Sequence, residues 1–232
     1  MRLVLFDIDG TLLTDRGAAR DAFAKALEAV YGYRGDLARY DFSGLTDPQI
    51  ARMILGDADL PRDEIDAGLP RLWDAYLDGL TRNATSDRVH ALPGIRPLID
   101  ALEPRAGVIL GLLTGNIEPG ARLKLDGARL NDHFAFGAFG SDSADRTRLP
   151  PIAMHRAGDL HGHRFDGRDV VIIGDSIHDV RCGVPYDATT IVIASGRTAY
   201  ETLRAENPRF LFESAEDLDK LLDAIVGCRV TA

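Results

Sequence analysis

Cysteine and lysine are both scarce in this chain. Only two of its 232 residues are cysteines, Cys182 and Cys228. This count predicts no disulfide framework and fits a reducing compartment such as the cytoplasm. Lysine occurs three times, as Lys25, Lys124 and Lys220. Any chemistry that needs a lysine therefore has very few candidates.

Long apolar runs and an excess of basic charge are also absent. No hydrophobic stretch approaches the ~20 residues of a membrane-spanning helix. The N-terminus enters an apolar segment directly, so we expect no signal peptide. The 36 acidic residues exceed the 27 Lys plus Arg, for a net charge of −9, which argues against a nucleic-acid partner. We therefore expect a cytoplasmic globular protein without a membrane or nucleic-acid partner.

An apolar run at the start of the chain ends abruptly in two acids. Residues 2–6 are typical of a strand buried on both faces of a parallel sheet, and Asp7-Ile8-Asp9-Gly10-Thr11 follows. Alternate residues of a strand point to the same side, so Asp7 and Asp9 are neighbours at its carboxyl end. Like charges this close favour a bound divalent cation, with Mg²⁺ the first candidate. The simpler alternative is an acidic turn that caps a strand.

The next part of the chain has helical periodicity only. Apolar residues recur at helical spacing over 19–30, Asp47-Pro48 is predicted to be an N-cap followed by a first-turn proline, and another helix is expected from Pro61 to Leu80. We find no strand pattern between residues 15 and 88. The sequence therefore predicts a helical cap at 15–88, inserted directly after the first strand.

Strands and helices alternate after the cap. The predicted strands are 107–113, 134–139, 170–173, 189–194 and 210–212, and the predicted helices are 93–102, 117–125, 149–158, 177–183 and 215–226. This alternation is typical of a doubly wound parallel sheet. We expect an α/β fold, with a Rossmann-like core made of residues 1–14 and 89–232 and an all-helical cap.

Polar motifs follow three of the predicted strands. They are the acidic pair at Asp7 and Asp9, then Thr114-Gly115-Asn116, then the segment from Gly174-Asp175 to Asp179. The carboxyl ends of parallel strands share one edge, so these groups can converge on one crevice. Alternatively, Thr114 only caps a helix, and Asp175 and Asp179 are first-turn acids that complement a helix dipole.

With these motifs in this order, the chain resembles the haloacid dehalogenase-like hydrolase superfamily. It is most similar to phosphoglycolate-phosphatase-like members, which carry a helical cap after the first strand. The resemblance implies that Asp7 is a nucleophile that forms an aspartyl-phosphate, and that Asp9 is the general acid and base. It also implies that Thr114, with the backbone of Gly115 and Asn116, holds the phosphoryl group.

The same resemblance implies a metal site. Asp7, the backbone carbonyl of Asp9, Asp175 and Asp179 would hold Mg²⁺, which the sequence does not distinguish from Mn²⁺. The implied activity is hydrolysis of a small-molecule phosphomonoester, either phosphoglycolate-like or a sugar phosphate. A β-phosphoglucomutase-type phosphomutase and a non-catalytic binding module on the same scaffold are the alternatives. Monomer and homodimer are equally compatible with the sequence.

One element of the family pattern is missing. The family places a lysine between the threonine and the last aspartates, where it pairs with the nucleophile. Lys124 lies eight residues beyond Asn116, roughly 12 Å along a helix, so we expect it to point away from the crevice. We expect Arg146, rather than Arg148, to take the lysine's place, because its guanidinium can bind phosphate with two donors. The alternative is a solvated loop.

The cap contains a loop that resembles a substrate-contacting loop of the family. It is Ser43-Gly44-Leu45-Thr46-Asp47, from which we expect Thr46 to contact the substrate, the alternative being that Thr46 and Asp47 only cap a helix. A substrate carboxylate would need a cation. The candidates are Arg16, Arg20, Arg39 and Arg52, of which Arg16 enters the predicted site.

Overall fold

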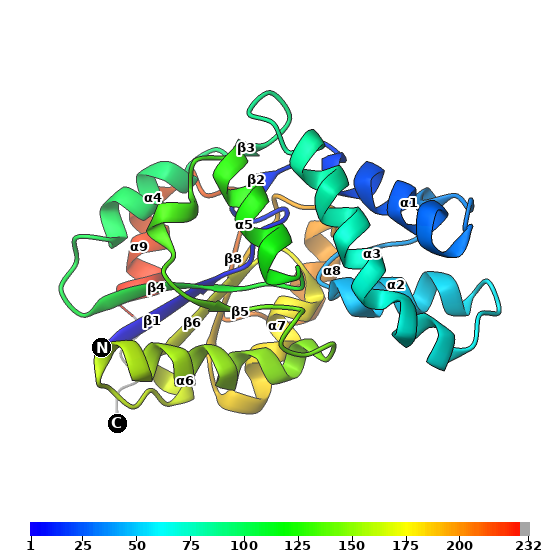
Figure 1. Ribbon diagram of the computed structural model, residues 1–232. Coiled ribbons are helices and arrows are strands. Elements are labelled where there is room, and N and C mark those ends of the chain that lie inside the picture. Colours follow the sequence, from blue (N-terminus) through cyan, green and yellow to red (C-terminus); the bar gives the residue numbers. More distant parts are fainter. Residues whose placement is uncertain (228–232) are drawn as a thin grey trace.

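The computed structural model describes residues 1–227 and shows an α/β core with a helical lobe at one end (Figure 1). All neighbouring strands of the six-stranded sheet are parallel, in the order β5-β4-β1-β6-β7-β8. The doubly wound parallel sheet predicted from the sequence is confirmed. The strands are β1 (Arg2–Phe6), β4 (Val108–Leu113), β5 (Gly137–Ala138), β6 (Val170–Gly174), β7 (Thr189–Ile193) and β8 (Phe210–Phe212).

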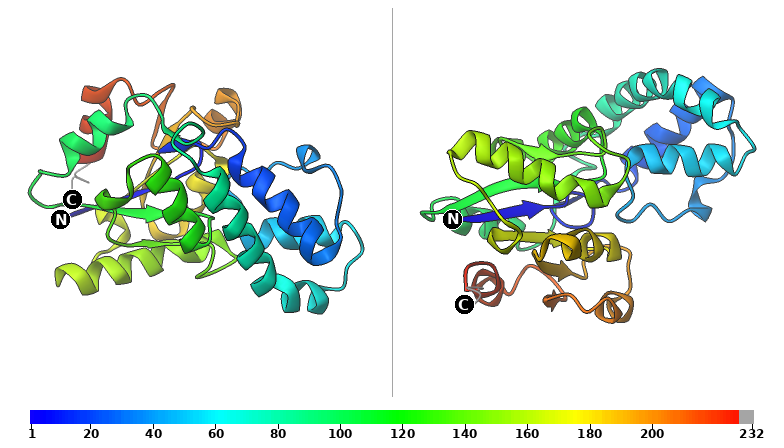
Figure 2. Two further views of the ribbon diagram at one scale, coloured as in Figure 1. Left: turned by 45° about the horizontal axis from the view of Figure 1, so that its top comes forward. Right: turned by 90° about the horizontal axis from the view of Figure 1, so that it is seen from below.

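Helices cover both faces of this sheet (Figure 2). One face packs against α4 (Ile95–Leu102), α5 (Glu118–Gly127) and α9 (Leu218–Val226). The other packs against α6 (Leu149–His161), α7 (Ile177–Gly183) and α8 (Tyr200–Ala205). The sequence did not predict α8, because a helix this short has no clear periodic pattern.

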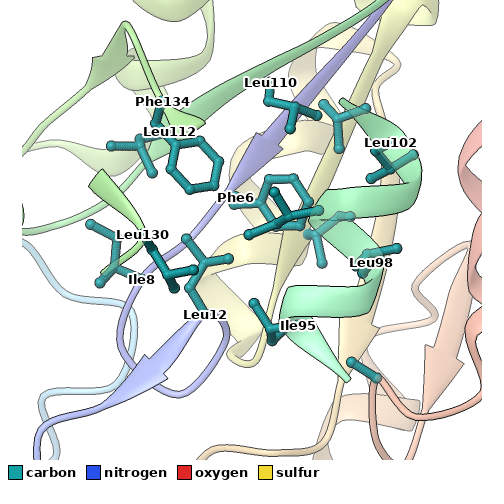
Figure 3. Close-up of a cluster of buried hydrophobic side chains, with 14 of the residues drawn as sticks. Phe6, Ile8, Leu12, Ile95, Leu98, Leu102, Leu110, Leu112, Leu130 and Phe134 are labelled. Atoms are coloured by element: carbon teal, nitrogen blue, oxygen red, sulfur yellow. The ribbon is translucent and has the colours of Figure 1, made fainter. Parts of the chain in front are cut away.

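Strand β1 lies in the middle of the sheet and fixes the position of the acidic motif. Val4 and Phe6 point to the face covered by α4, whereas Leu3 and Leu5 point to the opposite face. Figure 3 shows Phe6 surrounded by side chains of that first face. Phe6 pairs in register with residues of both β4 and β6, so the chain that follows it emerges between the ends of two neighbouring strands.

The cap consists of α1 (Ala18–Tyr31), α2 (Asp47–Gly56) and α3 (Arg62–Asn83). These helices enclose a core of their own, in which the Phe23 and Tyr76 rings meet edge to face with centroids 5.5 Å apart. No strand forms between residues 15 and 88, all of which the structure describes. A short antiparallel pair, β2 (Leu13–Thr14) with β3 (His90–Ala91), brings the two connecting segments together. The exact division between cap and core stays a prediction.

The start of α2 differs from the sequence prediction. Thr46, not Asp47, is the N-cap, and its hydroxyl accepts a hydrogen bond from the Gln49 N–H at 3.3 Å. The Gln49 side chain accepts the Thr46 N–H in return, so the two residues form a capping box. Because Thr46 is the N-cap, Asp47 lies in the first turn of the helix. Its carboxylate is therefore free to accept a hydrogen bond from another partner.

Two expectations from composition concern the chain as a whole. Within residues 1–227, no helix combines the length and the hydrophobicity needed to cross a bilayer. Cys182 is a buried free thiol on α7, as expected for a small core residue. Cys228 lies outside the described residues.

Candidate active site

A cavity of about 510 Å³ lies at the carboxyl edge of the sheet, beneath the cap. Its core side includes Asp7, Asp9, Thr114 and Asp175, as expected if the polar strand ends share one edge. Its cap side is mainly apolar and includes Phe23, Phe42, Leu45, Ile50 and Tyr76. The cavity therefore has a charged floor and a roof that is apolar in large part but also carries Arg16 and Arg20.

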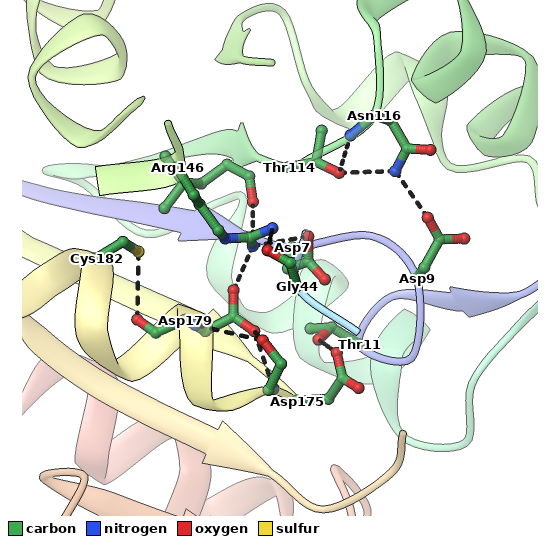
Figure 4. Close-up of polar contacts among 12 residues, drawn as sticks. Asp7, Asp9, Thr11, Gly44, Thr114, Asn116, Arg146, Asp175, Asp179 and Cys182 are labelled. Atoms are coloured by element: carbon green, nitrogen blue, oxygen red, sulfur yellow. Dashed lines mark hydrogen bonds and ion pairs between the residues drawn. The ribbon is translucent and has the colours of Figure 1, made fainter. Parts of the chain in front are cut away.

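Three buried carboxylates meet beside the cavity, and two of them, Asp7 and Asp175, line its floor. One oxygen each of Asp7, Asp175 and Asp179 can be chosen so that all three lie within 4.8 Å of one another. The Thr11 hydroxyl donates to Asp175 at 3.2 Å (Figure 4). The Ser176 hydroxyl donates to Asp179 at 2.6 Å. Asp175 and Asp179 are thus each oriented by a neighbouring hydroxyl. The chain brings together three of the four predicted metal-site aspartates through their side chains.

Glycine is required where the backbone passes closest to this cluster. Gly10 has φ +82°, and a Cβ there would lie 2.5 Å from the Asp175 Oδ2 atom. A Cβ at Gly196 would lie only 1.6 Å from the same oxygen. Side chains at these positions would displace Asp175, so the backbone approach depends on glycine.

The guanidinium of Arg146 lies among the carboxylates. Its Nη2 donates to Asp7 Oδ1 at 3.0 Å and also contacts Asp179. Arg146 is buried at the start of a short 3₁₀ turn (Arg146–Arg148), whereas Arg148 is exposed. The buried Nε has no hydrogen-bond partner in the described part of the chain, which leaves one donor unused. The structure thus places Arg146, and not Arg148, against the predicted nucleophile.

The charges in this cluster do not balance. When all three carboxyls are ionised, they face one guanidinium, which leaves a surplus of two negative charges. Burial, with repulsion from Asp179 and Asp9, raises the pKa of Asp7 to about 7, although Arg146 opposes the change. Burial and the neighbouring Asp7 likewise raise the pKa of Asp175. An all-oxygen donor set with this surplus fits a hard divalent cation.

The loop after β4 carries Thr114 and Asn116. Thr114 is buried, and its hydroxyl oxygen accepts hydrogen bonds from the Asn116 N–H at 3.3 Å and side-chain amide at 2.8 Å. No residue in the described range accepts the Thr114 hydroxyl hydrogen, so it remains available to a ligand. The structure brings Thr114, Gly115 and Asn116 to the cavity as predicted.

Lys124 lies in the site, and the expectation that it points away is wrong. Its Nζ donates to Asp9 Oδ2 at 2.7 Å and to Asn116 Oδ1 at 2.6 Å. The expected distance included only the rise along the helix and not the length of the lysine side chain. A lysine side chain is long and points back toward the N-terminus of its helix, which returns the ammonium to the crevice.

The cap loop is docked on the core through backbone and side-chain contacts. The Asp47 N–H donates to Gly115 O, and the Asp47 carboxylate accepts the Ile117 N–H, both at 2.8 Å. The Thr46 hydroxyl donates to Ala144 O at 2.8 Å, and this buried side chain does not line the cavity. Thr46 therefore joins cap to core in this structure, and Asp47 caps the start of α5. Burial raises the pKa of Asp47 to about 6.

The four candidate arginines of the cap fall into two groups. Arg52 pairs with Asp66 at 2.7 Å within the cap, and the Arg39 guanidinium lies over the Tyr40 ring. Arg16 and Arg20 line the cavity. Arg20 is held by the Leu37 and Tyr40 carbonyls and lies 4.1 Å from the Phe42 ring centroid, whereas Arg16 is exposed. Arg16 thus occupies a suitable place for the predicted substrate contact.

Sequence reasoning missed the loop after β7. Ser195, Gly196 and Arg197 line the cavity, and the Ser195 hydroxyl donates to Gly10 O at 2.7 Å. The rule that parallel strands end at one edge also applies to this strand. Its end carries no acidic motif, however, and so gave no chemical signal.

Comparisons with known proteins show the family and the fold of this chain. The haloacid dehalogenase-like hydrolase family model matches residues 4–183. No curated protein matches the chain. Similar solved structures include a predicted phosphatase from Clostridium acetobutylicum, with 19% identity, coverage of 96% of this chain and 98% of that one, and a TM-score of 0.75. A predicted phosphoglycolate phosphatase from Haemophilus somnus has 18% identity, the same coverages and a TM-score of 0.71.

A third structure, CbbY from Rhodobacter sphaeroides, was solved in complex with phosphate. It shares 19% identity with this chain over 94% of it and 96% of that chain, with a TM-score of 0.72. At these identities, the three structures establish a common fold.

Proposed function

The chain belongs to the haloacid dehalogenase-like hydrolase family, and we propose that it is a divalent-metal-dependent phosphatase of small phosphomonoesters. The observation that carries this proposal is the cluster in which Arg146 contacts Asp7 and Asp179 beside Asp175. The proposed nucleophile, a cation that pairs with it and three carboxylates that can ligate a metal thus lie close together. Hydrolysis through an aspartyl-phosphate on Asp7 is the reaction that uses all three.

In this reaction Asp7 attacks the phosphorus atom of the bound ester. The carboxylate and the phosphate dianion repel each other, so the approach requires neighbouring positive charge. Arg146 supplies it beside the attacking oxygen. The Thr114 hydroxyl is free to bind another phosphoryl oxygen. These donors hold the phosphoryl group in place while the bond forms.

The side chains of Asp7, Asp175 and Asp179, with the backbone carbonyl of Asp9, are proposed to hold Mg²⁺. When bound, the cation neutralises the two surplus negative charges and withdraws charge from the phosphoryl oxygens. Arg146 already neutralises part of the charge of the cluster. Since a carboxylate must lose its proton to ligate a metal, Asp7 and Asp175 would bind it in their ionised forms.

Asp9 is suited to general acid and base catalysis because its side chain is 41% exposed and lines the cavity. It would give a proton to the departing alkoxide and then take one from the water that attacks the aspartyl-phosphate. The cap roof excludes bulk water during these steps. Arg16 lines the cavity and would bind a second polar or acidic group of a small substrate, such as a phosphoglycolate-like or sugar phosphate.

The proposal is tested by measuring hydrolysis of p-nitrophenyl phosphate with Mg²⁺ and without any bisphosphate activator. We expect turnover that is abolished by EDTA, restored by Mg²⁺ and lost in Asp7→Asn. Turnover that persists after either treatment would contradict the proposal. Activity that appears only with a bisphosphate sugar would instead indicate a phosphomutase.

A further inference from the structure

The ammonium of Lys124 closes a ring of hydrogen bonds with Asp9 and Asn116. Lys124 Nζ donates to Asp9 Oδ2 at 2.7 Å and to Asn116 Oδ1 at 2.6 Å. The Asn116 side-chain N–H donates to the same Asp9 oxygen, also at 2.7 Å. One oxygen of Asp9 is therefore held by two donors, one of them charged. Charge-assisted hydrogen bonds of this kind are among the stronger ones.

The position of this lysine is costly for the fold. Its side chain is only 4% exposed. It lies on the buried side of α5 together with Ala121 and Leu125. An apolar residue would fill the same space without the desolvation cost of a buried charge. The carboxylates of Asp9, Asp15 and Asp47 offset that cost and raise the pKa of Lys124 despite its burial. Packing alone thus does not account for a lysine here.

Lys124 also fixes the orientation of the Asn116 amide. An asparagine can turn its oxygen or its nitrogen toward Asp9, and only the nitrogen can donate. Because an ammonium has donors only, its contact with Asn116 requires the amide oxygen on that side. The Asn116 nitrogen then faces Asp9 and the Thr114 hydroxyl oxygen. One lysine therefore determines how the asparagine links the general acid to the phosphoryl-binding threonine.

The second oxygen of Asp9 is left without a partner. Both donors act on Oδ2, and no residue among 1–227 donates to Oδ1. Since Asp9 lines the cavity, Oδ1 is the oxygen available to a substrate. We propose that Lys124 is a positioning residue that, together with Asn116, holds Asp9 so that its Oδ1 reaches the leaving-group oxygen.

This role rests on the phosphatase reaction proposed above. In the first step an Asp7 oxygen forms a bond to phosphorus while the ester P–O bond breaks. The electron pair of that bond stays on the ester oxygen, which takes its proton from Asp9. A poor leaving group depends on this proton, whereas p-nitrophenolate leaves as an anion and hardly needs it. Loss of Lys124 should therefore slow the first step more for a basic leaving group than for a weakly basic one.

The experiment compares two probes of similar size, phenyl phosphate and p-nitrophenyl phosphate, in single-turnover reactions with excess enzyme and Mg²⁺. The variant is Lys124→Met, which keeps the length of the side chain and removes the charge. We expect the rate constant for phenol release to fall about 10- to 100-fold, and that for p-nitrophenol release to change less than about threefold. Asp9→Asn shows how differently the two probes respond when the general acid itself is lost. Lys25→Met controls for the loss of a lysine, because Lys25 lies on the exposed face of α1.

Equal losses for the two probes would assign Lys124 a structural role and overturn the proposal, and so would no loss for either. If the methionine variant does not fold, Lys124→Gln, which keeps a neutral donor, is measured with the same two probes and the same criterion. Failure of the phosphatase assignment would look different. The unmodified enzyme would then release neither phenol, or would release them without involving Asp7.

Discussion

Arg146 Nη2 lies 3.0 Å from Asp7 Oδ1, although the two residues are 139 positions apart in the chain. The same nitrogen contacts Asp179 and donates to Leu113 O at 3.2 Å, so the guanidinium is fixed by three elements of the core. Its Nη1 donates to Gly44 O of the cap loop, also at 3.2 Å. One arginine therefore connects the candidate nucleophile, the carboxylate cluster and the docked cap.

Arg146→Ala is expected to reduce kcat with p-nitrophenyl phosphate by about 100-fold or more. The change removes a buried donor beside the attacking oxygen and leaves the carboxylates with less compensating charge. Arg148→Ala is the matched control, because Arg148 lies two residues away and is exposed. It should change kcat less than about twofold. Small and equal losses in the two variants would refute the role given to Arg146.

Gly115→Ala is expected to interfere with docking of the cap loop. A Cβ at this position would lie 2.0 Å from Leu45 O and 2.9 Å from the Thr46 Cα. Since both are backbone atoms, the loop must move, and we expect kcat/KM to fall about 10- to 100-fold. Gly120→Ala is the control, because its added Cβ meets nothing closer than 3.4 Å. Steady-state kinetics should separate the two, and equal values would contradict the importance of close docking.

Asp47→Asn should change how stability depends on pH. The folded-state pKa of Asp47 is about 6, above the usual 3.8, so between these values the folded protein binds more protons than the unfolded chain. Burial of this carboxyl therefore lowers the free energy of unfolding as the pH rises from about 4 to 6. Asparagine can still accept the Ile117 N–H and does not titrate.

Urea unfolding in EDTA at pH 4, 5, 6 and 7 measures this effect. The stability of the unmodified protein relative to Asp47→Asn should decrease by about 2 kcal/mol over that range. Since both proteins share every other titrating group, the difference isolates Asp47. A difference that is constant with pH would show that the Asp47 carboxyl is not buried against the core.

Metal binding should release protons near neutral pH. The pKa of Asp7 is raised to about 7 by burial and by its carboxylate neighbours, so at pH 6 this group is largely protonated in the metal-free protein. A cation displaces that proton, and the affinity for Mg²⁺ should rise with pH until Asp7 is ionised. Calorimetric titrations at pH 6 in two buffers of different ionisation enthalpy count the protons. An affinity that falls with rising pH would contradict a site built on Asp7.

The sequence was sufficient for the parts of the site that follow from strand ends. Asp7, Thr114 and Asp175 each follow a buried apolar segment, and the single edge of a parallel sheet makes them converge. Arg146 was identified because a cation was missing from the family pattern and arginine was available in the right segment. Its contact with Asp7 depends on a 3₁₀ turn that no local sequence pattern predicted.

Side-chain reach and contacts between domains could not be read from the sequence. Lys124 seemed too distant because spacing along a helix says nothing about a long side chain that points back. Thr46 and Asp47 looked like competing caps for one helix. In the structure they cap two, α2 and α5, and this division depends on how the cap meets the core. Such choices are made by tertiary packing, which local propensities do not encode.

The most direct test of the account is to identify the residue that carries the phosphoryl group. The enzyme is mixed with Mg²⁺ and p-nitrophenyl phosphate, quenched in acid and reduced with borohydride, which converts an aspartyl-phosphate to homoserine. Peptide mass spectrometry should then find homoserine at position 7, and it should be absent when EDTA replaces Mg²⁺. Turnover with the modification at another aspartate, or with none at all, would contradict Asp7 as the nucleophile.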